Sequence, residues 1–193
     1  MKKFIGILLV SLLAISAVNS EEMQFSQKDL YIKQILANDY NYSPSGFFSA
    51  IRDGNTHYVD LFLKSGMDPN TTYLKIPAIY CAIKTKQPET VKLLLDAGVN
   101  PNDKVMKQTP LAAAIMTKNT KTVNYLIQHG ANVNTESLGI TPLNYALMKR
   151  EPDVVKSLLN AGARVDEEAL KTALKLKDNN MKNMVLDKYK KQG

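Results

Sequence analysis

The residue types that most often act in catalysis or bind metals are scarce in this sequence. It has a single cysteine, Cys81, and two histidines, His57 and His129. A reactive thiol needs a base or a positive charge beside it, and a zinc site needs several Cys or His ligands. Neither histidine matches Cys81 in the register of the repeats described below, and no pair of carboxylates recurs so as to face across one cleft. We therefore expect no catalytic residue, no metal site and no cofactor.

Each of these residues has a simpler interpretation. Cys81 stands beside Ala82 in a predicted helix, where a small side chain suits packing or the lining of a groove. His57 lies at the start of another predicted helix. His129 precedes Gly130 at the end of one, where the negative end of the helix dipole favours it as a surface residue.

The composition is that of a folded, basic, single-domain protein. Of the 193 residues, 45% are hydrophobic, which is enough for a continuous core. The net charge is +7, but the basic residues do not cluster, so this charge does not indicate nucleic-acid binding. One cysteine cannot form an internal disulfide, and stability must therefore come from packing.

The segment 1–20 has the pattern of a secretory signal peptide. Lys2 and Lys3 precede an apolar run from Phe4 to Val18, and short side chains follow before Glu21. We expect cleavage after Ser20 and a mature protein that is periplasmic or secreted and does not enter the membrane. The alternative is an uncleaved membrane anchor, which normally needs about 20 apolar residues.

One sequence pattern recurs through the rest of the chain at a constant spacing. This spacing is the number of residues from Gly98 to Gly130. A repeat of about 20 to 50 residues is typical of a solenoid, in which each unit buries its apolar face only against its neighbours. The recurring positions are Gly66, Gly98, Gly130 and Gly162; Ala50, Ala82, Ala114 and Ala146; Val59, Val91, Val123 and Val155; Phe62, Leu94, Leu126 and Leu158; and Leu63, Leu95, Ile127 and Leu159.

Within each unit, apolar spacing predicts two short helices. In the third unit, Leu111, Ala114 and Ile115 keep one face of the first helix apolar, as Val123, Leu126 and Ile127 do in the second. A glycine such as Gly130 ends each second helix. The second helices are predicted to begin at Pro88, Thr120 and Pro152, since Pro suits a first turn and Thr can cap it.

The segments "TPLAAA" and "TPLNYA", with "VNYLIQHGANVN" and "VKLLLDAGVNPN", resemble ankyrin repeats. The resemblance covers residues 45 to about 188. It implies an all-α repeat solenoid, a stack of helix-turn-helix units joined by short hairpin loops, with helical caps at both ends. It also implies that another protein binds at the hairpin tips and the concave face.

Three features depart from the family pattern. The interval from the repeat glycine to the Thr is one residue short, so the family's hairpin shape cannot be assumed. The family's histidine is absent, so we expect its hydrogen bond between repeats to be missing; Phe48, Tyr80, Ala112 and Asn144 replace it. The glycine after the first helix survives only as Gly54, and Lys86, Lys118 and Arg150 replace it elsewhere.

These patterns predict the division of the chain. A capping helix and linker occupy residues 21–44, and the repeat domain occupies 45–188. The units are expected at about 45–76, 77–108, 109–140 and 141–166, with a terminal unit at 167–188 and a basic tail at 189–193.

Apolar residues stand where the resemblance places the partner-facing positions. Leu74, Met106 and Leu138 follow one another at the repeat interval, so stacking would align them at the hairpin tips. A contiguous exposed apolar patch marks an interaction surface. The alternative is that the shortened hairpins fold over and pack these side chains on one another. The full set of candidate partner-binding residues is Tyr73, Leu74, Ile76, Val105, Met106, Met116, Leu138, Ile140, Met148 and Lys149.

Lys86, Lys118 and Arg150 form a second candidate set. A cation at the end of a helix complements the helix dipole, and this alone explains the column. Alternatively, three aligned charges would attract an acidic partner.

We thus hypothesise an exported, monomeric, non-enzymatic protein that binds another protein. An inhibitor or immunity protein that blocks an enzyme or toxin is one possible role. A structural or maturation partner of an envelope enzyme is the alternative.

Overall fold

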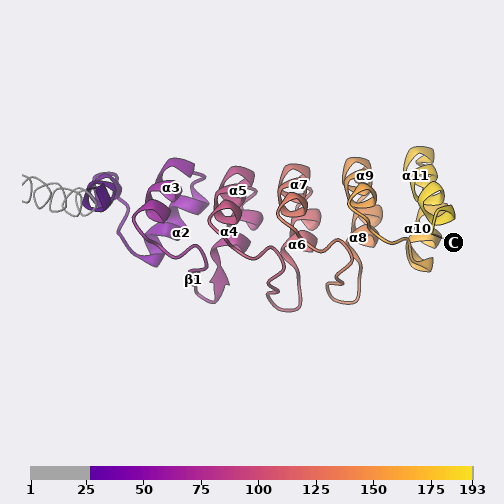
Figure 1. Ribbon diagram of the computed structural model, residues 1–193, viewed down its shortest axis with the longest axis horizontal. Helices are drawn as coiled ribbons and strands as arrows, with labels where there is room; N and C mark the ends of the chain where they lie inside the picture. The colour runs from indigo at the N-terminus through magenta and orange to yellow at the C-terminus, as the bar shows by residue number, and fades with distance from the viewer. Residues whose placement is uncertain (1–26, 193) are drawn as a thin grey trace, which may run out of the picture.

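The computed structural model describes residues 27–192, and these form an all-α solenoid (Figure 1). The predicted signal peptide, the alternative anchor and the last residue lie outside them. None of the helices within the described range combines the length and hydropathy that crossing a bilayer requires. The first helices of the units are α2 (Pro44–Arg52), α4 (Ala78–Lys84), α6 (Pro110–Met116), α8 (Pro142–Lys149) and α10 (Glu167–Lys175). The second helices are α3 (Thr56–Lys64), α5 (Pro88–Asp96), α7 (Thr120–Gln128), α9 (Pro152–Asn160) and α11 (Asn179–Lys190).

Local chemistry sets the helix boundaries. The Thr109 and Thr141 hydroxyls accept hydrogen bonds from backbone N–H groups in the first turns of α6 and α8. The predicted starts at Pro88, Thr120 and Pro152 are confirmed, but the expected cap at Thr120 was wrong, because the preceding Asn119 side chain accepts the hydrogen bond from the Thr122 N–H. Residues 27–36 are helical, as expected for the N-terminal cap, and α11 continues to Lys190, into the range expected as a tail.

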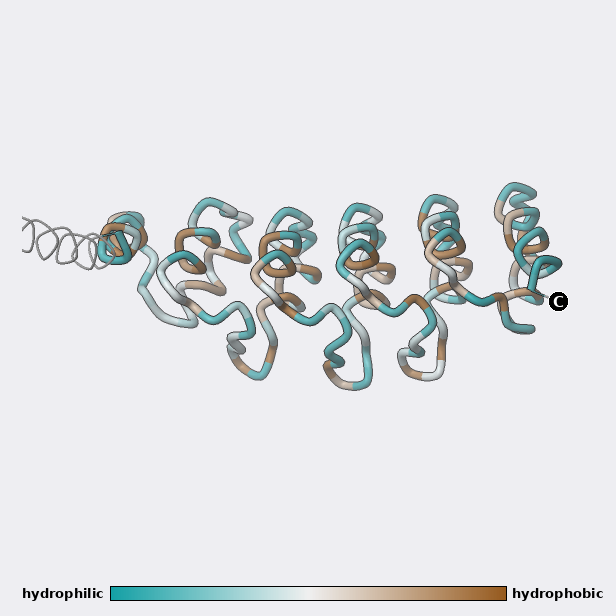
Figure 2. The backbone as a smooth tube through the Cα atoms, viewed as in Figure 1, coloured by the Kyte–Doolittle hydropathy of each residue, from teal (hydrophilic) through white to brown (hydrophobic). Residues whose placement is uncertain are grey.

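Each helix pair packs mainly on its neighbours in the stack. Contacts between successive first helices are as extensive as those within a pair, as for α6 with α7 and with α8. Ala82, Ala114 and Ala146 are fully buried, and their small side chains let the first helices approach closely. Figure 2 shows the apolar segments gathered within the helix pairs. The second helices contribute three recurring buried columns: Val59, Val91, Val123 and Val155; Phe62, Leu94, Leu126 and Leu158; and Thr90 with Thr122.

The hairpins project on the same side of the stack, beyond the first helices (Figure 1). In the first, β1 (Thr72–Tyr73) pairs antiparallel with β2 (Ile76–Pro77). The next two are closed by single bridges, Val105 to Gln108 and Ser137 to Ile140. Each bridge encloses two residues with positive φ, the signature of a type I′ turn. All three shortened hairpins thus have the same tight geometry.

Hydrogen bonds tie the second and third hairpins to the repeat before them, and one of them arises in the column where the family's histidine is absent. Tyr80 occupies the column of the missing histidine, yet its hydroxyl donates to the carbonyl oxygens of Gln108 and Asp103 in the next hairpin. The Val105 N–H donates back to the same hydroxyl, 3.3 Å away. Asn144, in the same column, donates to the Asp166 carboxylate at 3.2 Å. The histidine bond is absent as expected, but Tyr80 and Asn144 form other links to the following unit from the same column, whereas Phe48 and Ala112 have no side-chain donor.

Asparagines at the base of the hairpins add a second set of links. The Asn102 Oδ1 atom accepts from the Asn132 N–H, and Asn134 Oδ1 accepts from the Arg164 N–H, both at 2.8 Å. Their side-chain amides donate to the carbonyl oxygens of Gly130 and Gly162. These links connect consecutive units and limit rotation of one unit against the next.

Strain is stored where the family glycine is replaced. Gly54 has a φ of +68°, and the residues that replace it, Lys86, Lys118 and Arg150, have φ values of +58°, +56° and +55°. The left-handed conformation costs a residue with a Cβ about 1–2 kcal/mol, whereas glycine adopts it freely.

Replacing Lys86 by glycine should therefore stabilise the protein. We expect Lys86→Gly to raise the free energy of unfolding by about 0.5–1 kcal/mol, measured by urea denaturation. Lys177→Gly is the control, since Lys177 is also an exposed loop residue but is not among the positive-φ positions. If Lys86→Gly destabilises as much as Lys177→Gly, the left-handed strain is not real.

Removing the Tyr80 hydroxyl tests the link between repeats. Tyr80→Phe should lower the free energy of unfolding by about 0.5–1.5 kcal/mol, because partly buried hydrogen bonds are lost with no change in packing. Tyr125→Phe is the control, since its hydroxyl donates to an exposed carboxylate of Glu89. Equal small effects of the two substitutions on urea denaturation would contradict this role for Tyr80.

Candidate partner-binding surface

The hairpin tips present large apolar side chains to solvent. Leu74, Met106 and Leu138 are 78%, 89% and 61% exposed, and each is the first of the two turn residues of its hairpin. We call these three residues the tip stripe. The alternative in which the hairpins fold over and bury them on one another is wrong for this structure.

The conformation of the tip stripe is as unusual as its exposure. The φ values of Leu74, Met106 and Leu138 are +51°, +49° and +54°. Type I′ turns favour Asn and Gly at such positions, because these residues tolerate positive φ. Each tip therefore combines backbone strain with an unburied apolar side chain, and neither feature helps the hairpin fold. Strain retained at an exposed site points to a role in function.

The remaining candidate residues divide into two groups. Tyr73, Ile76, Met116 and Met148 are exposed and extend the apolar surface from the tips toward the first helices. By contrast, Val105 and Ile140 are half-buried and pack partly against the core, and Lys149 is also half-buried. These three residues therefore have less exposed surface for a partner to contact than the other candidates have.

The column of basic residues is not a row of three equivalent charges. Lys118 lies 2.7 Å from Glu151, and its ammonium also donates to the Lys149 carbonyl oxygen. Lys86 and Arg150 form no ion pair within residues 27–192. All three residues follow their helices in the left-handed conformation, so their charges lie just beyond the helix ends.

A small pocket lies beside the first hairpin, and sequence reasoning did not predict it. It has a volume of about 200 Å³ and lies between α2, the hairpin and α4. Phe48, Tyr73, Ile76 and Cys81 form apolar walls. Burial raises the pKa of the Cys81 thiol, and the nearby Arg52 charge only partly offsets this effect. Cys81 is thus a protonated lining residue near neutral pH rather than an activated nucleophile.

Tyr80, also at this pocket, serves as a hydrogen-bonding group. Burial raises the pKa of Tyr80 to about 12. Its hydroxyl therefore stays protonated and keeps donating to the next hairpin.

The histidines make structural contacts. The two ring nitrogens of His129 lie 2.8 Å from the Tyr125 carbonyl oxygen and 2.9 Å from Asp96 Oδ1, which bridges α7 to α5. The His57 ring packs edge-on against Tyr58. No group of three or more His, Cys, Asp or Glu side chains in the described part of the chain is arranged to hold a metal ion.

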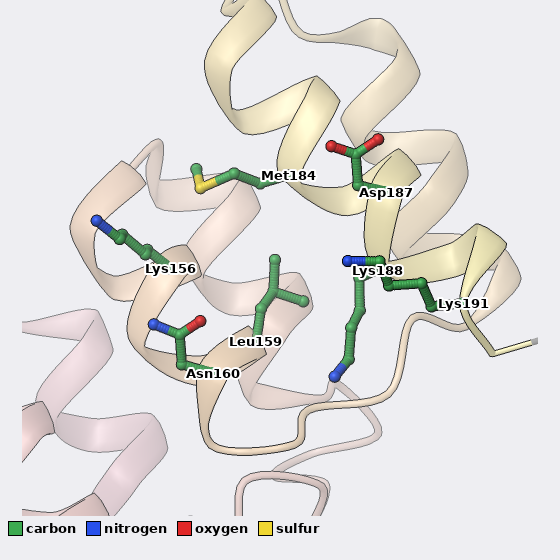
Figure 3. A pocket seen from close by; sticks show the side chains of 7 residues that line it. All are labelled: Lys156, Leu159, Asn160, Met184, Asp187, Lys188 and Lys191. Carbon is green, nitrogen blue, oxygen red and sulfur yellow. The ribbon is translucent and has the colours of Figure 1, made fainter.

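A wider hollow lies between α9 and α11, away from the hairpins (Figure 3). Its lining includes Leu159, Met184 and several charged side chains. Figure 3 shows that the polar ends of Lys156, Asp187 and Lys188 point in different directions rather than toward one point. This hollow therefore lacks the convergent polar groups of a ligand site.

Comparison with known families agrees with the observed architecture. A family model of ankyrin repeats in three copies matches residues 97–169, and a model of the single ankyrin repeat matches residues 77–104. A search of curated proteins found no match. Ankyrin repeats are general protein–protein interaction modules. Ankyrin repeats are therefore present across residues 77–169, within a stack of helix pairs that forms an all-α repeat solenoid.

Proposed function

We propose that this chain is a non-enzymatic binding protein whose partner protein docks on the tip stripe and the adjoining side of the first helices. The exposure of Leu74, Met106 and Leu138 in strained turns is the observation that carries the proposal. Burying one such side chain at an interface contributes about 1.5–3 kcal/mol. The packed repeats space the hairpins regularly and each hairpin closes on itself through backbone pairing, which places the three residues before the partner arrives and lowers the entropic cost of binding.

We further propose that the protein acts after export, and that it blocks an enzyme or toxin by covering its active site. The residues that support export are the two lysines and the apolar run at positions 2–18. Support for a blocking role comes from the projecting hairpins, since three aligned protrusions can enter a concave surface. A supportive role for an envelope enzyme is the alternative, and the effect of binding on the partner's activity separates the two.

A triple variant tests the docking surface. Leu74→Ser, Met106→Ser and Leu138→Ser together should weaken binding of the captured partner about 100-fold or more, because most of the apolar anchors are lost. Affinity would be measured by calorimetry after capture from the exported fraction of the native host.

The matched control replaces three leucines outside the tips. Leu30, Leu36 and Leu174 are 52–54% exposed, so their change to serine alters surface hydropathy to a similar degree. The control should keep the partner's affinity. Equal loss in both variants, or full affinity of a folded tip variant, would remove the docking site from the tip stripe.

Export has its own test. Mass spectrometry of the protein recovered from the native host should show a chain that begins at Glu21 in the exported fraction. Recovery of a chain that retains Met1 in the membrane fraction would instead support the uncleaved anchor.

A further inference from the structure

The pocket beside the first hairpin has a size and a lining that suit the binding of one side chain. Sites for small molecules usually have volumes of about 300–1,000 Å³, and this pocket has about 200 Å³. Phe48 from α2, and Tyr73 and Ile76 from the two strands of the hairpin, supply apolar surface, and Leu74 of the tip stripe also lines the pocket. The pocket is thus continuous with the proposed docking surface.

Two positively charged side chains line this apolar pocket. Arg52, at the end of α2, and Lys84, at the end of α4, line it and are both exposed. Neither forms an ion pair within residues 27–192; Arg52 donates only to the Ser49 hydroxyl, at 3.0 Å. The carboxylate next to Arg52, that of Asp53, accepts a hydrogen bond from Tyr40 instead. The two charges are therefore available to a carboxylate from outside.

The register of the repeats confines this charge to one end of the stack. The column that begins with Arg52 and Lys84 continues as Met116 and Met148. In the third unit, the Gln108 amide contacts the Met116 sulfur at 3.0 Å, so side chains already occupy the matching position. This column of the docking surface is thus basic at the first two units and carries methionine at the next two.

We propose that this pocket receives one aromatic or large aliphatic side chain from a partner protein, in a segment that places a carboxylate against Arg52 and Lys84. The inference rests on the proposed function and adds to it the chemistry of the partner. An acidic segment with a single apolar anchor matches both the apolar walls and the unpaired cations, and charge complementarity of this kind speeds association and selects the partner. The pocket's volume of about 200 Å³ suits one side chain, and its continuity with the tip stripe favours a segment of the same partner protein as the occupant.

Selection from a random peptide library on the full chain tests this chemistry. Enriched peptides should carry an aromatic or large aliphatic residue with Asp or Glu within two positions. Their affinity should fall about ten-fold or more for the double variant Arg52→Glu and Lys84→Glu, since attraction becomes repulsion. Lys156→Glu with Lys177→Glu is the matched control for net charge and should keep the affinity.

The alkylation rate of Cys81, the sole cysteine, reports whether the pocket is occupied. A bound peptide should slow its alkylation by iodoacetamide at alkaline pH. Enriched peptides without acidic residues, equal binding by the two double variants, or unchanged Cys81 alkylation would each overturn the inference. One further outcome would overturn the inference. In that outcome no peptide is enriched, and the chain instead binds vesicles of anionic lipids in a way that Arg52→Glu and Lys84→Glu abolish.

The captured partner separates this inference from the proposed function. Suppose that the triple tip variant loses the partner and the double variant at Arg52 and Lys84 keeps it. The partner then binds the tip stripe but does not use the pocket. If only the Arg52 and Lys84 variant loses the partner, the pocket is the docking site and the tip stripe is not.

Discussion

Every feature of this molecule depends on packing between consecutive repeats. A single pair of short helices cannot bury its apolar face, so each unit needs its neighbours. The columns that contain Ala114 and Leu126 satisfy this need at a fixed interval, which also places the hairpins at a fixed interval. The hydrogen bonds of Tyr80 then hold the second hairpin against the preceding α4, and those of Asn102 link the base of that hairpin to the next unit. A surface made of three separate loops thereby becomes one rigid surface.

Stability and binding make opposite demands at the hairpin tips. A tight two-residue turn favours small residues that tolerate positive φ, yet Leu74 and Met106 are large and apolar. The solenoid tolerates this local cost because the strain is confined to exposed turns and the core is unaffected. The same holds for Lys86, whose left-handed backbone lies outside the packed helices. Local sequence preferences thus fail mainly at positions on the surface that a partner could reach.

Much of the fold could be predicted from the sequence because its signals are local and recur in every unit. Proline at Pro88 and a capping residue at Thr141 mark helix starts wherever they occur. The hydrogen bonds of Tyr80 were missed, since they depend on how far one hairpin leans toward a side chain of the preceding repeat. The pocket was missed because Arg52 and Lys84 belong to different units. Their shared register was the signal that could have shown it, because residues one repeat apart become neighbours in the stack.

Methionine oxidation in the presence of the partner tests the central claim most directly. Met106 is 89% exposed at a hairpin tip, whereas Met184 lines the hollow between α9 and α11 at the other side of the stack. If the partner docks on the tip stripe, saturation with it should slow the oxidation of Met106 by hydrogen peroxide and leave that of Met184 unchanged. Protection of Met184 with no change at Met106 would contradict the account, because it would place the partner on the opposite surface.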